Sequence, residues 1–197
     1  MYDAVLFDFF GVIFDDPQKP WLERCDADGK KAVTNAARLL DTGKITYDEY
    51  MERLASAGDA SLETVRAEFQ SSILLNRDVV ATIAELGDRG SVGLLSNTCT
   101  EEITPLFNQH DLHPLFDSVV ISSEIGMAKP DHAIFSLAVE RLGSTPERTV
   151  FVDDNGSNVA AAAEVGLTAV HFQNVQQLRD DLTILGVLPA DGGQEKE

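Results

Sequence analysis

The sequence predicts an α/β fold in which a doubly wound parallel sheet carries an inserted, all-helical cap. Three observations lead to it: short apolar runs that stop at polar residues, helical periodicity between those runs, and one early stretch with helical signals but no strand. The chain has 197 residues, of which 44% are hydrophobic. It is therefore long enough to bury one core and a smaller appended unit.

The short apolar runs predict the strands. Continuous apolar runs of this length are typical of strands that are buried on both faces of a parallel sheet. The runs cover residues 4–7, 92–95, 118–121, 150–152 and 169–172. Three of them are followed at once by Asp8, Ser96 and Asp153. Ligands of such sheets bind beyond the carboxyl ends of the strands, so we expect these three polar side chains to converge there.

Helical periodicity between the runs predicts the helices that cover the sheet. One apolar stripe consists of Val79, Val80, Ile83 and Leu86. A second lies within residues 135–142 and is closed by Gly143, a suitable C-terminal cap. An alanine-rich segment after Asn158 stops at Gly166 in the same way. Strands that alternate with helices indicate a parallel sheet.

The early stretch breaks this alternation and predicts the cap. Thr46 followed by Glu49 is a capping box, and residues 41–44 (Asp-Thr-Gly-Lys) indicate a turn between two helices. The predicted boundaries are 1–15 and 77–188 for the α/β core, 16–76 for the helical cap, and 189–197 for a polar tail expected to be disordered.

Composition excludes several classes of partner. Fifteen Lys and Arg residues stand against 33 Asp and Glu residues, and the net charge of -18 disfavours nucleic acid and anionic membranes. A small phosphorylated substrate remains compatible, because a bound cation and a few lysines dominate the field inside a cleft. Two unpaired cysteines, no signal peptide pattern and no apolar stretch of about 18 residues favour a cytoplasmic protein. We expect a monomer or a simple homodimer.

Carboxylates at the strand ends predict a metal site. Asp8 ends the first predicted strand before a glycine turn, and Asp153 and Asp154 end another. Adjacent acids at one sheet edge repel each other, and a hard cation such as Mg²⁺ relieves that repulsion through oxygen ligands. The alternatives are that Asp8 caps its strand end, and that the other two acids cap the alanine-rich helix.

Two further motifs offer donors to a phosphoryl group. Ser96 and Asn97 provide a hydroxyl and an amide, and Lys129 places an ammonium just before a predicted helix. Lys129 could also neutralise charge between a nucleophile and a phosphate. Each motif alone is ordinary turn chemistry, and it is the ordered set that indicates a phosphate site. Arg38 and Lys44 in the cap are interpreted as solvated surface cations.

With these motifs in this order, the sequence resembles the haloacid dehalogenase superfamily of hydrolases over nearly the whole chain. By that resemblance Asp8 is the nucleophile, Ser96 is the second motif, Lys129 the third, and Asp153 with Asp154 the acidic fourth. The resemblance also implies a magnesium ion. Its implied ligands are the Asp8 carboxylate, the Phe10 backbone carbonyl and Asp154, with Asp153 acting directly or through water.

A narrower similarity points to bacterial sugar-phosphate phosphatases of the α-D-glucose-1-phosphate phosphatase type. It rests on residues 43–46, 95–98, 129–130 and 151–155. The implied activity is hydrolysis of a small phosphorylated metabolite, with sugar phosphates favoured, through an aspartyl-phosphate on Asp8.

One departure from the family pattern concerns proton transfer. Most phosphatases of the family carry a second aspartate two residues after the nucleophile as general acid and base, and this chain has Phe10 there. The resemblance then implies a slow enzyme that favours sugar 1-phosphates or acyl phosphates. Two alternatives stay open: a haloacid dehalogenase, which Asp153 and Asp154 disfavour, and a catalytically weak, metal-binding regulatory protein.

Overall fold

The computed structural model describes residues 1–189, so the predicted tail falls, apart from Pro189, outside the described residues. A five-stranded sheet with the order β3-β2-β1-β4-β5 forms the centre, and every neighbouring pair of strands is parallel. The strands are β1 (Ala4–Phe7), β2 (Ser91–Ser96), β3 (Ser118–Ile121), β4 (Thr149–Asp153) and β5 (Thr168–His171). Each predicted apolar run therefore lies in a strand, with shifts of one residue at some ends.

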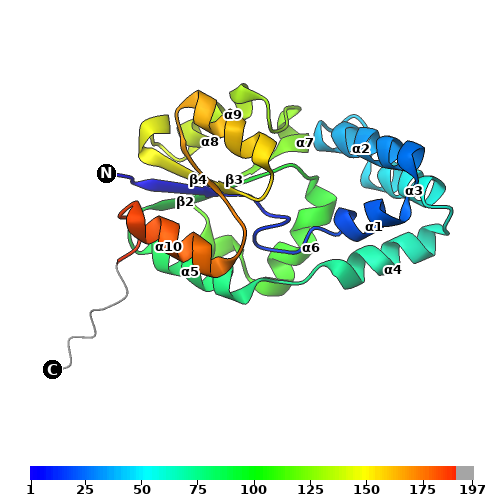
Figure 1. The fold of residues 1–197 in the computed structure, drawn as a ribbon, viewed down its shortest axis with the longest axis horizontal. Coiled ribbons are helices and arrows are strands. Elements are labelled where there is room, and N and C mark those ends of the chain that lie inside the picture. Colours follow the sequence, from blue (N-terminus) through cyan, green and yellow to red (C-terminus); the bar gives the residue numbers. More distant parts are fainter. Residues whose placement is uncertain (190–197) are drawn as a thin grey trace.

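Helices cover both faces of the sheet (Figure 1). One face packs against α5 (Arg77–Gly87), α6 (Thr100–His110) and α10 (Val175–Ile184), and the other against α8 (His132–Arg141) and α9 (Gly156–Val165). A short helix, α7 (Ser122–Ile125), follows β3 directly. Side chains of β1 alternate between the two apolar clusters, since Val5 and Phe7 join one and Ala4 and Leu6 the other. The α/β prediction with a parallel sheet is confirmed.

A helical insertion follows β1 and lies beside the carboxyl ends of the strands (Figure 1). It contains α1 (Gln18–Arg24), α2 (Ala27–Asp41), α3 (Tyr47–Ala57) and α4 (Leu62–Ser72). The insertion has its own apolar cluster around Trp21, Met51 and Leu54, and Cys99 from the start of α6 belongs to it. The predicted helical insertion is therefore confirmed.

Local signals in the insertion explain where its helices begin. The capping box is formed as predicted, because the Thr46 side chain accepts from the Glu49 backbone N–H while the Glu49 carboxylate accepts from the Thr46 backbone N–H. Gly43 lies in the turn before it with φ +67°, and a Cβ there would lie 2.6 Å from the Ser123 carbonyl oxygen. Only glycine permits this close approach of the insertion to the core.

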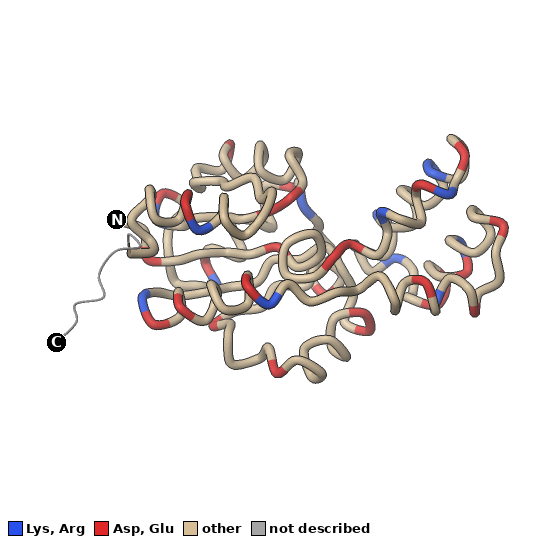
Figure 2. The backbone as a smooth tube through the Cα atoms, turned by 60° about the horizontal axis from the view of Figure 1, so that its bottom comes forward, with Lys and Arg blue, Asp and Glu red and all other residues tan. Residues whose placement is uncertain are grey.

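Acidic residues outnumber basic residues, and they are not confined to one part of the molecule (Figure 2). Figure 2 shows acidic residues spread along both the sheet region and the inserted helices. None of the described helices combines the length and the hydropathy that a bilayer crossing requires.

Strand register brings the predicted site residues together. Phe7 at the end of β1 pairs with Leu94 of β2 on one side and with Val152 of β4 on the other. The residues that follow, Asp8 and Asp153, therefore leave neighbouring strands at the same edge of the sheet.

Candidate active site

Lys129 is the centre of the site. It is buried, and its ammonium lies 2.8 Å from Asp8 Oδ1 and 2.7 Å from Asp153 Oδ2. A third donated hydrogen bond, 2.8 Å long, goes to the backbone carbonyl of Leu95. An ammonium has three N–H groups, so all of its donors have partners here. Lys129 therefore ties the ends of β1, β2 and β4 together through one charged group.

Asn97 fixes the segment that carries Lys129. Its side-chain amide donates to the Lys129 carbonyl at 2.9 Å, and its side-chain oxygen accepts from the Lys129 backbone N–H at 2.8 Å. This paired contact holds the loop before α8 against the end of β2. Asn97 also lines the cavity described below.

Asp153 is fully buried, and both of its carboxylate oxygens accept hydrogen bonds from protein donors. Oδ1 accepts from the Asn155 backbone N–H at 2.7 Å, and Oδ2 accepts from Asn158 at 3.0 Å in addition to Lys129. Asn155 also caps α9 by accepting from the Ser157 backbone N–H. The acid at this position is thus held by the first turn of the following helix.

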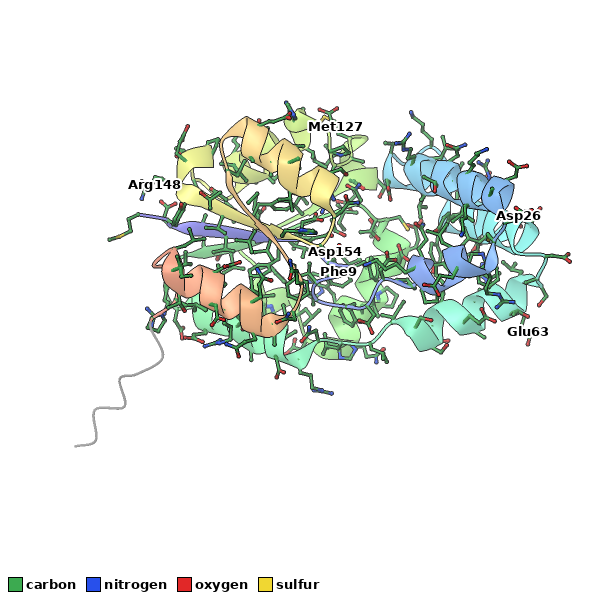
Figure 3. The ribbon with its side chains drawn as sticks, viewed as in Figure 1. Phe9, Asp26, Glu63, Met127, Arg148 and Asp154 are labelled. Carbon is green, nitrogen blue, oxygen red and sulfur yellow. The ribbon has the colours of Figure 1, made fainter. Side chains whose placement is uncertain are left out.

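Asp154 lies between the sheet and the inserted helices in the view of Figure 3. Its carboxylate contacts the ammonium of Lys19, 2.5 Å away, on a side chain that is 60% exposed. The turn after Asp8 passes close to it, since a Cβ on Gly11 would lie 2.4 Å from the Asp154 carboxylate. Gly11 also has φ +90°, so both the backbone conformation and the close approach of Asp154 require glycine at this position.

Three carboxylates form a cluster at this edge. Asp8, Asp153 and Asp154 each offer one oxygen, and these oxygens lie within 4.8 Å of one another. Carboxylate oxygens are the ligands that Mg²⁺ prefers, so the donor set fits a hard divalent cation. The predicted meeting of Asp8 and Asp154 is confirmed.

At Asp8, the candidate nucleophile, burial and the charge of Lys129 shift the pKa in opposite directions. Burial raises the pKa of Asp8 to about 7, against the lowering effect of Lys129 and with a further raising effect from Asp153. Burial alone would lower the pKa of Lys129, but the two carboxylates beside it outweigh burial and raise it. The lysine is therefore held in its charged form.

A cavity of about 200 Å³ opens above this cluster, between the core and the inserted helices. Five of the predicted site residues line it: Asp8, Phe10, Asn97, Lys129 and Asp154. Asp153 lies beneath the surface of the cavity, in contact with Lys129. Ser96 is buried at the end of β2, and among the described residues its hydroxyl has no hydrogen-bond partner. Arg38 and Lys44 border a separate hollow.

The cavity also contains residues that were not predicted from the sequence. Asp16 from the loop before α1, Asp41 from the end of α2 and Glu102 from the first turn of α6 all line it, with Tyr50 and Gln18. Burial raises the pKa of Asp41 and of Glu102 to about 7, and it raises that of Asp16 as well. Thr98, four residues before Glu102, donates a hydrogen bond to it and is a weak signal in the sequence for Glu102. For the other four residues the sequence offers no signal.

The relatives of this chain include one of similar length and one that is much longer. The chain is 29% identical over 208 residues to the D-ribitol-5-phosphate phosphatase of Bacteroides thetaiotaomicron, covering 94% of this chain and 98% of the relative. It is 28% identical over 204 residues to the drimenol cyclase of Aspergillus calidoustus, covering 99% of this chain and 38% of that protein. The chain thus spans nearly all of the first and about two fifths of the second.

Solved structures share the fold at low identity. A haloacid dehalogenase-like enzyme of Bacteroides thetaiotaomicron, in complex with magnesium and inorganic phosphate, superposes with a TM-score of 0.69 at 22% identity, covering 88% of this chain and 95% of that one. An L-2-haloacid dehalogenase of Xanthobacter autotrophicus superposes with a TM-score of 0.66 at 21% identity, covering 96% and 85%. The fold alone therefore does not distinguish an enzyme that binds magnesium and phosphate from a dehalogenase.

A family assignment rests on the sequence itself. The sequence pattern of haloacid dehalogenase-like hydrolases matches residues 2–166, which span β1, the insertion and all the carboxylates of the cluster. The chain therefore belongs to the haloacid dehalogenase-like hydrolases.

Proposed function

We propose that the chain is a magnesium-dependent phosphatase that hydrolyses a small phosphorylated metabolite, with sugar phosphates favoured, through a phosphoryl group carried on Asp8. The observation that carries the proposal is Lys129, bound between Asp8 and Asp153 beside Asp154 at the floor of one cavity. The ribitol-phosphate phosphatase relative, and the structure of similar fold that holds magnesium and inorganic phosphate, support it.

Covalent chemistry is assigned to Asp8. Its carboxylate oxygen attacks phosphorus, the phosphorus–oxygen bond to the substrate alcohol breaks, and the leaving oxygen takes a proton from water. A second water then attacks the phosphoryl group, and the bond to Asp8 breaks to release phosphate and restore the carboxylate. Lys129 keeps its charge beside Asp8 and offsets the negative charge that gathers there.

Substrate binding is assigned to Ser96, Asn97 and Lys129. Ser96 ends β2 directly before Asn97; its hydroxyl is buried without a partner among the described residues and does not itself line the cavity. Asn97 and Lys129 line the cavity. Because all three N–H groups of Lys129 already have partners, it acts on the substrate in this proposal through its charge. Phe10 lines the same cavity and cannot transfer a proton. The enzyme should then be slow, and favour leaving groups that depart without protonation, such as those of sugar 1-phosphates and acyl phosphates.

The proposed magnesium ligands are the carboxylates of Asp8 and Asp154 and the backbone carbonyl of Phe10. Asp153 acts through water in this proposal, because both of its oxygens already accept from protein donors. When bound, the ion supplies positive charge that stabilises the phosphoryl oxygens.

The experiment is a phosphate-release screen over sugar phosphates, acyl phosphates and nucleotides with magnesium. Asp8→Asn should lower kcat by about 10³-fold or more, because it removes the nucleophile. Asp28→Asn, an exposed aspartate of α2, is the matched control and should behave as wild type. Equal phosphate release by wild type and Asp8→Asn would refute the assignment of the nucleophile.

The same preparation tests the alternatives. Release of chloride from 2-chloropropionate that a chelator leaves unchanged would indicate a dehalogenase in place of a phosphatase. The three-carboxylate cluster argues against that outcome, because Lys129 is shared by Asp8 and Asp153 and the lysine beside Asp154 is mostly exposed, which leaves a donor set suited to a divalent cation. No turnover over the whole panel, together with magnesium binding, would indicate a regulatory protein.

A further inference from the structure

Three carboxyl groups line the cavity away from Asp8, and they come from three separate segments. Asp16 precedes α1, Asp41 ends α2, and Glu102 lies in the first turn of α6. All three line the same cavity, and the charges of Asp41 and Asp16 both raise the pKa of Glu102. The insertion and the core thus supply one shared acidic wall.

Among the described residues no ion pair is formed by these three carboxyl groups, although the charges of Lys129 and Lys19 act on Asp41 and Asp16. Among the residues lining the cavity, Lys129 is the one cation, and it is bound to Asp8 and Asp153. Arg38 and Lys44 do not line this cavity; they border a neighbouring hollow that Asp41 and Lys129 also line. A substrate that carries a second anionic group would therefore bring it against three carboxyl groups, while the one lysine of the cavity lining is already bound to Asp8 and Asp153.

Asp41 and Glu102 also have unused capacity to accept hydrogen bonds. Glu102 accepts one hydrogen bond, 2.8 Å long, from the Thr98 hydroxyl. No side-chain hydrogen bond reaches the Asp41 carboxyl among the described residues, although burial raises its pKa to about 7. Asp41 also ends a helix, where the dipole disfavours negative charge. Glu102 lies in the first turn of α6, where the dipole favours its charge, but burial outweighs this and raises its pKa to about 7 as well. A role in binding would explain why two acids occupy these buried positions.

The remaining lining supports a small polar ligand. The side-chain amide of Gln18 donates to the Tyr50 hydroxyl at 2.6 Å, and both residues line the cavity. The cavity volume of about 200 Å³ is below the roughly 300–1,000 Å³ of sites for drug-sized ligands. A short polyol chain is of a size that this space accommodates.

We propose that the group leaving with the substrate's ester oxygen carries hydroxyl or ammonium donors and no second anionic group, and that Asp41 and Glu102 are the residues that select it. This inference rests on the phosphatase function proposed above and names the substrate class for that site. The carboxyl groups accept hydrogen bonds from donors, and they repel a carboxylate or a second phosphate.

The test uses substrates that differ in one group. Glycerol 3-phosphate and 3-phosphoglycerate share a three-carbon skeleton, and a carboxylate replaces the terminal hydroxymethyl group in the second. We expect kcat/KM at pH 8 to be at least about 10-fold higher for glycerol 3-phosphate. A second pair, 2-hydroxyethyl phosphate and phosphoethanolamine, identifies whether the preferred donor is a hydroxyl or an ammonium group, and a preference for either over phosphoglycolate supports the proposal.

Variants assign the selection to the two residues. Asp41→Asn and Glu102→Gln should each reduce the preference for glycerol 3-phosphate over 3-phosphoglycerate by about 3-fold or more, because each removes one negative charge. Asp28→Asn on the same helix as Asp41, and Glu101→Gln beside Glu102, are the matched controls and should keep the wild-type ratio. Circular dichroism checks that the variants are folded.

Failure of this inference and failure of the phosphatase proposal give different results. If phosphate release depends on Asp8 but wild type hydrolyses both members of the pair equally, or the variants keep the wild-type ratio, the substrate class is wrong and the phosphatase stands. If no phosphate ester is hydrolysed, both proposals fall.

Discussion

Lys129 both stabilises the fold and places positive charge at the site. Its ammonium contacts two buried carboxylates and a strand carbonyl, so every one of its donors is used inside the protein. Removing one partner from such a buried network leaves charge without compensation, which costs far more than losing a surface ion pair. The same contacts place positive charge beside Asp8.

Lys129→Met should therefore affect stability and activity together. We expect the free energy of unfolding to fall by about 3–5 kcal/mol, because Asp8 and Asp153 lose their shared cation. We expect kcat to fall by about 10²-fold or more, because the charge beside the nucleophile is lost. Urea denaturation and phosphate release measure the two effects, with the exposed Lys31→Met as control. A variant with wild-type stability would contradict the network described.

Lys19 is the residue that competes with a cation at Asp154. Its ammonium contacts the Asp154 carboxylate 2.5 Å away, while most of its side chain is exposed. Lys19→Ala should lower the dissociation constant for Mg²⁺ by a few-fold, since an ammonium beside the site repels a divalent ion. Isothermal titration calorimetry measures the change, with Lys31→Ala as the matched control. Weaker magnesium binding in Lys19→Ala would show that the lysine supports the site.

At the scale of the elements, the insertion is held to the core by a few close contacts. Gly43 lies against the Ser123 carbonyl, and Cys99 at the start of α6 joins the apolar cluster of the insertion. Asp41, two residues before Gly43, and Glu102, three residues after Cys99, reach the cavity from these two contact points. The acidic wall therefore depends on how the insertion meets the core.

The capping box of α3 gives a prediction at this scale. Thr46→Ala removes the side-chain acceptor for the Glu49 backbone N–H and should lower the free energy of unfolding by about 0.5–2 kcal/mol. Because α3 begins away from the cavity residues of the core, we expect kcat/KM to stay within about 2-fold of wild type. Thermal unfolding measures the change, and Thr34→Ala, an exposed threonine inside α2, should show no such loss. Equal effects of the two substitutions would mean that the cap contributes nothing.

Local patterns predicted the elements better than they predicted the cavity. The strands at residues 4–7 and 118–121 match their apolar runs, because burial on both faces leaves a continuous signal. In contrast, α6 was not predicted, since Pro105 interrupts it and few apolar residues mark it. Asp8 and Asp153 could be brought together because the carboxyl ends of parallel strands lie at the same edge of a sheet. The meeting of Asp41 with Glu102 could not, because it depends on the packing of one element on another.

At the scale of the whole molecule, ionised carboxyl groups in the cavity reduce stability. Burial raises the pKa values of Asp41 and Glu102 from 3.8 and 4.5 to about 7 in the folded protein. Lys129, Asp16 and Tyr50 face these two groups from the other elements that line the cavity. Between pH 4 and 7 the unfolded chain has released these protons and the folded protein still holds them. The free energy of unfolding must therefore fall as the pH rises through that window, and stay low above it.

Replacing both acids by amides should remove this loss. At pH 8 we expect the double variant Asp41→Asn, Glu102→Gln to unfold with a free energy about 1–3 kcal/mol higher than wild type, a value discounted for partial exposure. Near pH 4 the two proteins should be equal, since the carboxyl groups are protonated in the folded state. Urea denaturation at both pH values, without magnesium, measures the difference. A double variant that is less stable at pH 8 would show that the ionised acids hold the cavity together. Higher stability with loss of substrate selection would instead mean that these carboxyl groups serve binding at a cost to folding.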